Sequence, residues 1–480
     1  MNITDPKKLI GADKENVMSL LIKNGLIVTS TDSTVGDVYV EEGTIQVIGK
    51  NLTMKADEIV DATGKYILPG AIDPHTHIDI PFMGTAETDD YETGTIAAAC
   101  GGVTSLIDFA LQFKGESIKE CLDRKQSWAE GKAAIDFSQH PGIMDPTPEV
   151  IAEVEKAIHE YGTPSFKVFM VYDFRVDDET MINLMEETKK HGGLVQVHAE
   201  NVYMIQHLNK VFEREGTLDI YHHALSRPNL AEEEAVFRAC KMVELTGSSL
   251  YVVHLSTKEG LRQIQEARMK GLNIYAETCP QYLLLTDDKY KLPGFEGAKY
   301  VMSPPLRTKE SNDALWDGIN SGDVMTLATD HCPFFFDGIK DKFGKDDYKK
   351  IPNGAPGIET LLPLMHSEGV KKGKISLEKM VDVLSTATAR IFGMDKKGSI
   401  TVGKDADIVV FDPDQEFTVT NSKLHMNVDY TPFEGYEITG MPYKVYSRGK
   451  LVAQWAGDQV DFTGEPGWGK FVKRIPFKPF

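Results

Sequence analysis

The segment Tyr66-Ile-Leu-Pro-Gly-Ala-Ile-Asp-Pro-His-Thr-His77 joins an apolar run to two histidines separated by one residue. In an extended strand, residues two apart point to the same side, so His75 and His77 can direct two imidazoles at one point. Imidazole is a ligand suited to zinc and its neighbours. Two histidines two apart also occur by chance, so the pair indicates a metal site only if later strands supply further ligands.

Eight apolar strands alternate with helical stretches after Gly70, which is the pattern of βα units and a parallel sheet. The predicted strands are Ile67–His75, Val103–Phe109, Ala133–Gln139, Ser165–Met170, Leu194–Ala199, Leu250–Leu255, Asn273–Thr278 and Val324–Thr329. Thr257 is predicted to cap one of the intervening helices. Eight such units over about 300 residues are what a closed (β/α)8 barrel requires. An open doubly wound sheet fits the same alternation, and the count alone does not decide between them.

Short strands with turn signals and no helix flank this region on both sides. Residues 18–66 and 393–457 are each too short for a core of their own, so we predict one small β-sandwich built from both termini around a barrel at residues 67–392. Residues 1–17 are polar and lack periodicity, which predicts an extension outside the fold. The tail, residues 458–480, is rich in aromatic side chains and is predicted to lie on another subunit.

The composition limits the kinds of partner and compartment that suit this protein. The net charge of −20 over 480 residues argues against a nucleic-acid partner, which needs a basic face. The longest apolar runs are too short to cross a bilayer, and no N-terminal segment has the pattern of a signal peptide. The five cysteines show no CxxC spacing, which indicates reduced thiols in a cytoplasmic protein.

Chemistry in such barrels lies at the C-terminal ends of the strands. Six side chains of suitable type occur there or within a strand: His75, His77, Lys167, His198, His254 and Asp330. Each has an ordinary explanation by itself, because strand-end histidines often pack and a strand lysine often reaches to water. Together, at the same end of five strands, they indicate a shared functional site.

Lys167 cannot bind a metal as an ammonium, because that group has three donors and no acceptor. Burial and nearby cations lower the pKa of a lysine, and the neutral amine can react with carbon dioxide. The resulting carbamate has two oxygens and can bridge two divalent metals. Carbamate, Asp330 and one hydroxide would reduce the charge of two dications from about +4 to about +1.

Seven motifs in order resemble the dihydropyrimidinase and hydantoinase branch of the amidohydrolase superfamily. They are Asp73-Pro-His-Thr-His-Ile-Asp79, Phe166-Lys-Val-Phe-Met170, Gln196-Val-His-Ala-Glu-Asn201, Val253-His-Leu-Ser-Thr-Lys-Glu259, Thr278-Cys-Pro-Gln-Tyr282, Met302-Ser-Pro-Pro-Leu-Arg307 and Thr329-Asp-His-Cys-Pro333. The resemblance runs from about Met18 to about Gly457. It implies a zinc-containing (β/α)8 barrel with a composite β-sandwich, assembled as a homotetramer.

The resemblance also implies two Zn²⁺ per subunit and a role for each motif residue. His75, His77 and Asp330 would hold one zinc and His198 and His254 the other, with N6-carboxylysine at Lys167 and a hydroxide bridging both. Tyr172 matches a tyrosine that hydrogen-bonds the oxyanion, and Ser303 and Asn353 match positions that bind the imide edge of the ring, largely through backbone groups. Phe82, Met83 and Phe169 are expected to wall the pocket. The segment Phe137–Met144 departs from the family pattern and has no predicted role.

The predicted reaction is hydrolysis of the cyclic amide bond of 5,6-dihydropyrimidines (dihydrouracil, dihydrothymine), of 5-substituted hydantoins, or of both, to N-carbamoyl amino acids. A zinc-bound water would attack, and Asp330 would carry its proton to the leaving nitrogen. Allantoinase and dihydroorotase are alternatives. Relatives that bind dihydroorotate have an arginine directly after the second histidine, where this chain has Ile78-Asp79. A non-enzymatic scaffold of the same fold is a further alternative, although all six ligand positions are filled.

Overall fold

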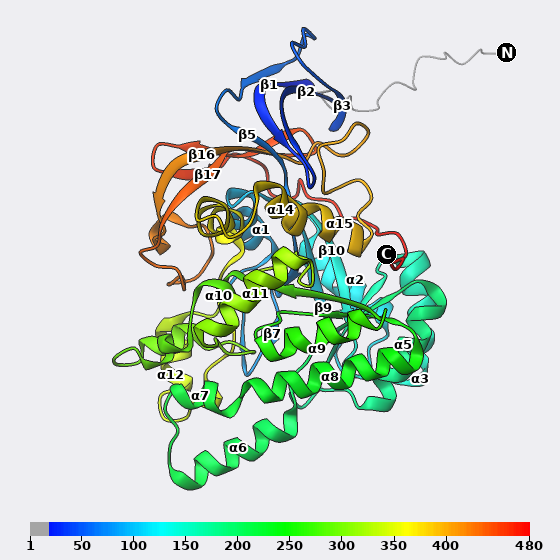
Figure 1. The fold of residues 1–480 in the computed structure, drawn as a ribbon, viewed down its shortest axis with the longest axis vertical. Coiled ribbons are helices and arrows are strands. Elements are labelled where there is room, and N and C mark those ends of the chain that lie inside the picture. Colours follow the sequence, from blue (N-terminus) through cyan, green and yellow to red (C-terminus); the bar gives the residue numbers. More distant parts are fainter. Residues whose placement is uncertain (1–18) are drawn as a thin grey trace, which may run out of the picture.

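The computed structural model describes residues 19–480, and the predicted extension at residues 1–17 lies outside them. Within the described chain, a β-sheet made from both ends sits on one side of a larger α/β barrel (Figure 1). No helix among residues 19–480 is both long and apolar enough to cross a membrane.

The larger part is a parallel barrel, which confirms the predicted (β/α)8 fold. Its eight strands follow one another in chain order: β6 (Ala71–Thr76), β9 (Val103–Leu111), β10 (Asp136–Gly142), β11 (Ser165–Phe169), β12 (Leu194–His198), β13 (Ser249–Val252), β14 (Asn273–Thr278) and β15 (Thr326–Leu327). Each overlaps one of the eight predicted strands. Because the order never reverses, the open doubly wound alternative is excluded.

Hydrogen bonds to the side chain of Asp73 help to close the barrel between its last and first strands. The β15 strand has only two residues, and beyond it the backbone N–H of Thr329 donates to Asp73 Oδ1 at 3.1 Å. Farther along, Thr76 and His331 form a parallel bridge, and His77 N–H donates to His331 O at 2.9 Å. The buried Asp73 carboxylate thus replaces part of the ladder that would otherwise join β15 to β6.

Helices between the strands cover the barrel. They are α1 (Tyr91–Cys100), α2 (Ile118–Ala129), α3 (Pro148–Ala152), α4 (Val154–Lys156), α5 (Asp178–His191), α6 (Val202–Glu215), α7 (Tyr221–Ser226), α8 (Asn229–Thr246), α9 (Lys258–Met269), α10 (Pro280–Leu284), α11 (Lys309–Ser321), α12 (Asp341–Phe343), α13 (Leu361–Leu364), α14 (Leu377–Val381) and α15 (Ala387–Phe392). Thr257 caps α9 by accepting from Gly260 N–H at 3.0 Å, as predicted.

The smaller part is one sheet to which both ends of the chain contribute, as predicted. Its strands are β1 (Ser19–Val28), β2 (Ser33–Glu41), β3 (Thr44–Gly49), β4 (Glu58–Asp61), β5 (Tyr66–Pro69), β16 (Ile408–Thr418), β17 (Glu437–Ser447), β18 (Lys450–Ala456) and β19 (Gln459–Phe462). The two ends meet where β5 pairs antiparallel with β16. Apolar side chains from both ends, among them Ile22, Val38 and Val410, share one core.

Gly70 separates the two parts. The predicted first strand, Ile67–His75, is divided there into β5 of the sheet and β6 of the barrel. A Cβ atom at Gly70 would lie 2.0 Å from Thr104 Oγ1, so only glycine allows the chain to pass so close to β9. The boundary therefore falls at Gly70, a few residues beyond the predicted position.

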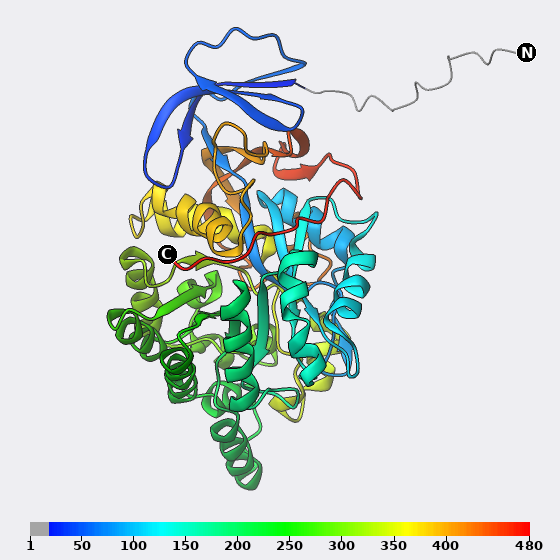
Figure 2. The ribbon, with the colours of Figure 1, turned by 90° about the vertical axis from the view of Figure 1, so that its right-hand side faces the viewer.

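The C-terminal tail packs against its own barrel (Figure 2). The sheet continues past residue 457 to Phe462, and the following residues cross the N-terminal end of the barrel strands. Val472 N–H donates to Phe137 O at 2.7 Å, and the buried Arg474 guanidinium donates to Ser138 Oγ, Ser165 Oγ and Gln139 O. The aromatic tail thus has partners within its own chain, and its contact with another subunit stays a prediction.

Candidate metal centre and active site

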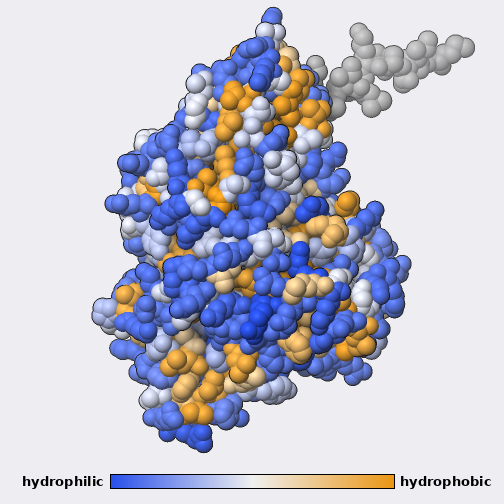
Figure 3. All heavy atoms as spheres, viewed as in Figure 1, coloured by the Kyte–Doolittle hydropathy of each residue, from blue (hydrophilic) through white to orange (hydrophobic). Residues whose placement is uncertain are grey.

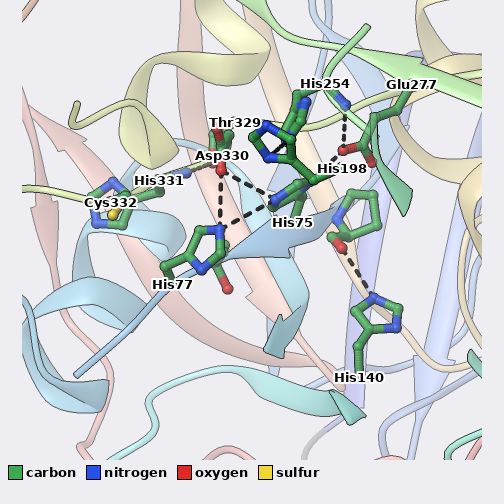
Figure 4. A network of polar contacts seen from close by, with 12 residues as sticks. His75, His77, His140, His198, His254, Glu277, Thr329, Asp330, His331 and Cys332 are labelled. Atoms are coloured by element: carbon green, nitrogen blue, oxygen red, sulfur yellow. Dashed lines mark hydrogen bonds and ion pairs between the residues drawn. The ribbon is translucent and has the colours of Figure 1, made fainter. Parts of the chain in front are cut away.

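Three predicted ligands converge at the end of the first and last barrel strands (Figure 4). His75 Nε2 and His77 Nε2 lie 3.3 Å apart, and each lies 3.1 Å from Asp330 Oδ1. Ligand atoms bound tetrahedrally at zinc distances are separated by about 3.3 Å. The three atoms therefore already have the spacing of a small cation's coordination shell.

The other two histidines form a second group beside the first. His198 Nδ1 and His254 Nε2 lie 3.0 Å apart, and the rings of His75 and His254 are 5.3 Å apart between centroids. His198 and His254 are 3% and 2% exposed. Burial lowers the pKa of both imidazoles, so each is neutral at physiological pH, which is the form that binds metals.

Lys167 enters this region from β11 with a fully buried side chain. Its Nζ has no hydrogen-bond partner among the described residues and lies 4.8 Å from the centre of the Phe109 ring. Burial lowers the pKa of this amine to about 8. An unsatisfied buried ammonium is costly, so the surroundings of Lys167 do not stabilise its charged form and are compatible with a modified side chain.

Two buried glutamates that were not predicted from the sequence orient the histidines of the site. Glu277 Oε1 pairs with His75 Nδ1 and accepts from His254 N–H at 3.1 Å, and Glu200 Oε2 lies 2.7 Å from His198 Nε2. Each carboxylate binds the ring nitrogen that faces away from the convergence point. Such partners fix the tautomer of a metal-binding imidazole and leave its other nitrogen free as the ligand. Glu200 occurs in a quoted motif, so its spacing two residues after His198 was the available signal.

The end of β6 is held by a buried ion pair that sequence reasoning also missed. Asp108 Oδ1 accepts from Thr76 Oγ1 at 3.0 Å and from Ile78 N–H at 3.1 Å, and Lys125 Nζ lies 2.9 Å from Asp108 Oδ2. These contacts clamp the residues on either side of His77. The direction of the His77 ring therefore depends on β9 and α2 as well as on its own strand.

Three site residues adopt the left-handed backbone conformation that non-glycine residues rarely use. Tyr172 has φ 72°, His254 has φ 37° and Asp330 has φ 54°. Each such residue costs about 1–3 kcal/mol and persists only where surrounding contacts enforce it. Concentration of this strain in one site is typical of functional constellations rather than of packing alone.

One cavity collects the predicted substrate-binding residues in front of the ligands. Tyr172, Ser303 and Asn353 line it together with His77, Lys167, His198, His254 and Asp330. Phe82 and Phe169 contribute to its wall as expected, and Met83 lines a wider adjoining cavity. The fold therefore brings all nine predicted site residues to one place.

Two neighbouring positions differ from expectation. Ile78 is fully buried within 4 Å of the Cβ position of Gly94 in α1, and it is not among the residues that line the cavity. His140, in the segment without a predicted role, lies in the barrel interior, where its Nδ1 lies 2.6 Å from Ser165 Oγ and its Nε2 lies 3.1 Å from Pro74 O. His140 thus contacts β6, the strand that carries His75, from inside the barrel and does not face the substrate cavity.

The fold is a parallel barrel. Four histidines, a lysine and an aspartate from its strands form a candidate binuclear metal centre. Residues 66–452 match the model of the amidohydrolase family, and the chain belongs to that family.

Individual relatives agree with this assignment. The chain is 48% identical over 463 residues to a D-hydantoinase of Geobacillus stearothermophilus, which covers 96% of this chain and 97% of the relative. It is 41% identical to a D-hydantoinase of Ralstonia pickettii over 96% of this chain and 100% of that protein. The crystal structure of a dihydropyrimidinase from Brevibacillus agri superimposes with a TM-score of 0.93 at 46% identity, covering 96% of this chain and 100% of that one.

Proposed function

We propose that this protein is a cyclic amidohydrolase that opens the rings of 5,6-dihydropyrimidines, 5-substituted hydantoins, or both, and releases N-carbamoyl amino acids. The observation that carries the proposal is the single cavity in which both ligand groups face Tyr172, Ser303 and Asn353. The family membership and the names of the relatives, D-hydantoinase and dihydropyrimidinase, support the same chemistry.

The cavity favours a neutral ring over an anionic one. Among its lining residues in the described chain, Lys167 is the one Lys or Arg, and the proposed modification makes that side chain an anion. Ile80, Phe82, Leu111, Phe169 and Phe174 supply apolar walls. A carboxylate such as that of dihydroorotate would lose its hydration against these apolar walls without gaining a cationic side chain among the residues that line the cavity. This is a better reason to disfavour dihydroorotate than Ile78, which does not line the cavity.

We propose two Zn²⁺ ions in this site, one held by His75, His77 and Asp330 and the other by His198 and His254, with carboxylated Lys167 shared by both. The spacing of the first three ligand atoms and the unsatisfied Lys167 Nζ support this assignment. When bound, such ions lower the pKa of a coordinated water toward neutrality and polarise a carbonyl group.

Tyr172 would stabilise the negative charge that develops on the ring carbonyl oxygen. Burial raises the pKa of its hydroxyl, so the group keeps its proton at neutral pH and can donate it in a hydrogen bond. Its ring is held edge-on to Phe82 and stacked on Phe174, with centroids 5.7 and 5.2 Å away. The hydroxyl is therefore fixed before substrate arrives and needs little reorganisation.

Asp330 would move the proton. Burial alone would raise the pKa of this carboxyl, but the adjoining His75 and His77 imidazoles outweigh it and hold the pKa well below its usual range. The group is thus a carboxylate at neutral pH and can accept a proton from the attacking water. It can then pass that proton to the ring nitrogen that leaves as the C–N bond breaks.

Turnover of paired substrates tests the proposal. We expect the purified protein to hydrolyse dihydrouracil, a bulky 5-aryl-hydantoin, or both, with about two zinc ions per chain by metal analysis. Allantoin and dihydroorotate serve as controls and should react far more slowly. Preferential turnover of either control, or a metal-free protein without activity on any ring, would contradict the proposal, and the second result would favour the scaffold alternative.

We also propose that the protein assembles as a homotetramer in the cytoplasm. Exposed apolar side chains on α6, α7 and α8, such as Tyr203, Leu230 and Leu245, support self-association. Figure 3 shows apolar surface at the end of the molecule where Figure 1 places α6 and α7. All five cysteines are free and buried, as expected for a reducing compartment. Light scattering of the purified protein would measure the assembly, and a monomer would contradict it.

A further inference from the structure

Lys340 is a buried lysine that the proposed chemistry does not use. It ends the segment Phe336–Lys340, in the loop that follows Asp330, and its side chain is fully buried. Its Nζ donates to three backbone carbonyls: Ala298 O at 3.2 Å, Val301 O at 3.0 Å and Gly354 O at 2.6 Å. The three protons of an ammonium are thus matched by three acceptors.

Those carbonyls belong to the two loops that carry the imide-binding residues. Val301 lies two residues before Ser303, and Gly354 directly follows Asn353. The loops also bond directly, because Gly354 N–H donates to Val301 O at 3.0 Å. A Cβ atom at Gly354 would lie 2.3 Å from Cys332 O, so this loop also presses closely against the segment after Asp330.

We propose that Lys340 is a positioning residue that fixes the separation of the Ser303 and Asn353 loops and thereby the fit of the imide edge of the substrate ring. The inference rests on the proposed function, because it takes these two loops as the imide-binding elements. Lys340 does not line the cavity, so it acts through the loops and does not contact the ring.

Ordinary structural roles do not account for this side chain. No carboxylate in residues 19–480 lies within 4.0 Å of Nζ, so it is not half of an ion pair. Burial lowers the pKa of the amine to about 7, whereas the three carbonyl oxygens around Nζ favour the protonated form with its three donors. An apolar residue would fill the same space without the cost of burying a charge. An apolar residue, however, has no hydrogen-bond donor and cannot hold three carbonyl groups from two loops at one point.

Lys340→Met tests the role, because it keeps the length of the side chain and removes all three donors. We expect KM to rise about tenfold, the effect of losing hydrogen bonds of ordinary strength, with kcat changed less than threefold and metal content unchanged. The increase should be equal for dihydrouracil and for a 5-aryl-hydantoin, because both present the same imide edge. Lys340→Gln, which retains two donors, should give an intermediate KM and serves if the Met variant does not fold.

Lys342→Met is the matched control. Lys342 lies two residues after Lys340, in α12, but its side chain is exposed and has no ion pair or hydrogen bond within residues 19–480, so its loss should leave KM unchanged. Hydrogen exchange of the holoenzyme adds a readout that needs no turnover. In Lys340→Met, peptides covering residues 298–303 and 351–357 should exchange faster than in the wild type and in the control.

The outcomes separate the two proposals. Unchanged KM and unchanged exchange in Lys340→Met would overturn the positioning role, as would a KM increase restricted to one substrate or accompanied by loss of metal. If the wild-type protein hydrolysed neither ring, the proposed function would fail. The exchange measurement alone would then decide whether Lys340 couples the two loops.

Discussion

Replacing Lys167 by alanine, or withholding carbon dioxide while the metal centre is assembled, should prevent the centre from forming. Lys167 supplies no ligand atom as an ammonium, and its Nζ is unsatisfied within the described chain. The carbamate made from carbon dioxide would provide two oxygens between the His75 and His198 groups. Metal binding and activity should therefore depend on the same small molecule.

The structure sets the size of this effect. Burial lowers the pKa of Lys167 from 10.5 to about 8, so at pH 7.5 about a quarter of the side chains carry the neutral amine, against about 0.1% for an exposed lysine. That is an enrichment of about two hundredfold in the form that reacts with carbon dioxide. Because the amine loses its proton as the pH rises, the rate of assembly at a fixed concentration of dissolved carbon dioxide should increase up to about pH 8 and level off above it.

Reconstitution of chelator-treated protein measures the dependence. Zinc would be added in carbon-dioxide-free buffer between pH 7.0 and 9.0, either without bicarbonate or with bicarbonate adjusted at each pH to the same concentration of dissolved carbon dioxide, and activity, zinc content and the signal from ¹³C-labelled bicarbonate would be followed. Lys167→Ala should recover neither metal nor activity, whereas Lys309→Ala, which removes an exposed lysine, should behave as wild type. Full zinc occupancy with normal turnover in Lys167→Ala, or recovery that ignores bicarbonate, would refute the reasoning.

Three further substitutions separate the roles of other side chains. Tyr172→Phe should lower kcat about 10²–10³-fold at unchanged zinc content, and a wild-type kcat would exclude the hydroxyl as an oxyanion donor. Glu277→Gln should weaken zinc binding about 10–100-fold in a competition titration with a chelator, because His75 loses the charge that fixes its tautomer; equal affinity would contradict that role. Phe82→Ala should change the ratio of rates on a 5-aryl-hydantoin and dihydrouracil about tenfold, and an unaltered ratio would remove Phe82 from the specificity wall.

The barrel could be predicted from the sequence because its strands are short apolar runs between helices with clear caps. All eight predicted strands occur, and Thr257 caps α9 as its position indicated. The limit of strand one could not be predicted, because the run on either side of Gly70 is apolar throughout. What divides it is the close approach of Thr104, a residue of another strand, which no local pattern reveals.

Part of the candidate site could likewise be predicted from the sequence, and part could not. Ligands at strand ends share one edge whenever the strands are parallel, so His198, His254 and Asp330 could be placed together without coordinates. Glu277 pairs with His75 across 202 positions of sequence, and this contact depends on how closure of the barrel brings β14 and β6 to either side of β15. The tail could not be placed either, because its aromatic residues do not indicate which surface they cover.

The geometry assigns different tasks to the barrel and to its loops. Groups proposed to bind the metals and set the chemistry, such as His75 and Asp330, are fixed by the barrel strands and by a buried carboxylate behind His75. Groups proposed to recognise the ring lie on loops whose separation depends on Lys340. Changes in the loops can therefore alter which ring is accepted while the metal ligands stay in place. The ligand motifs alone therefore do not determine the substrate preference, although they predict the proposed ligand set.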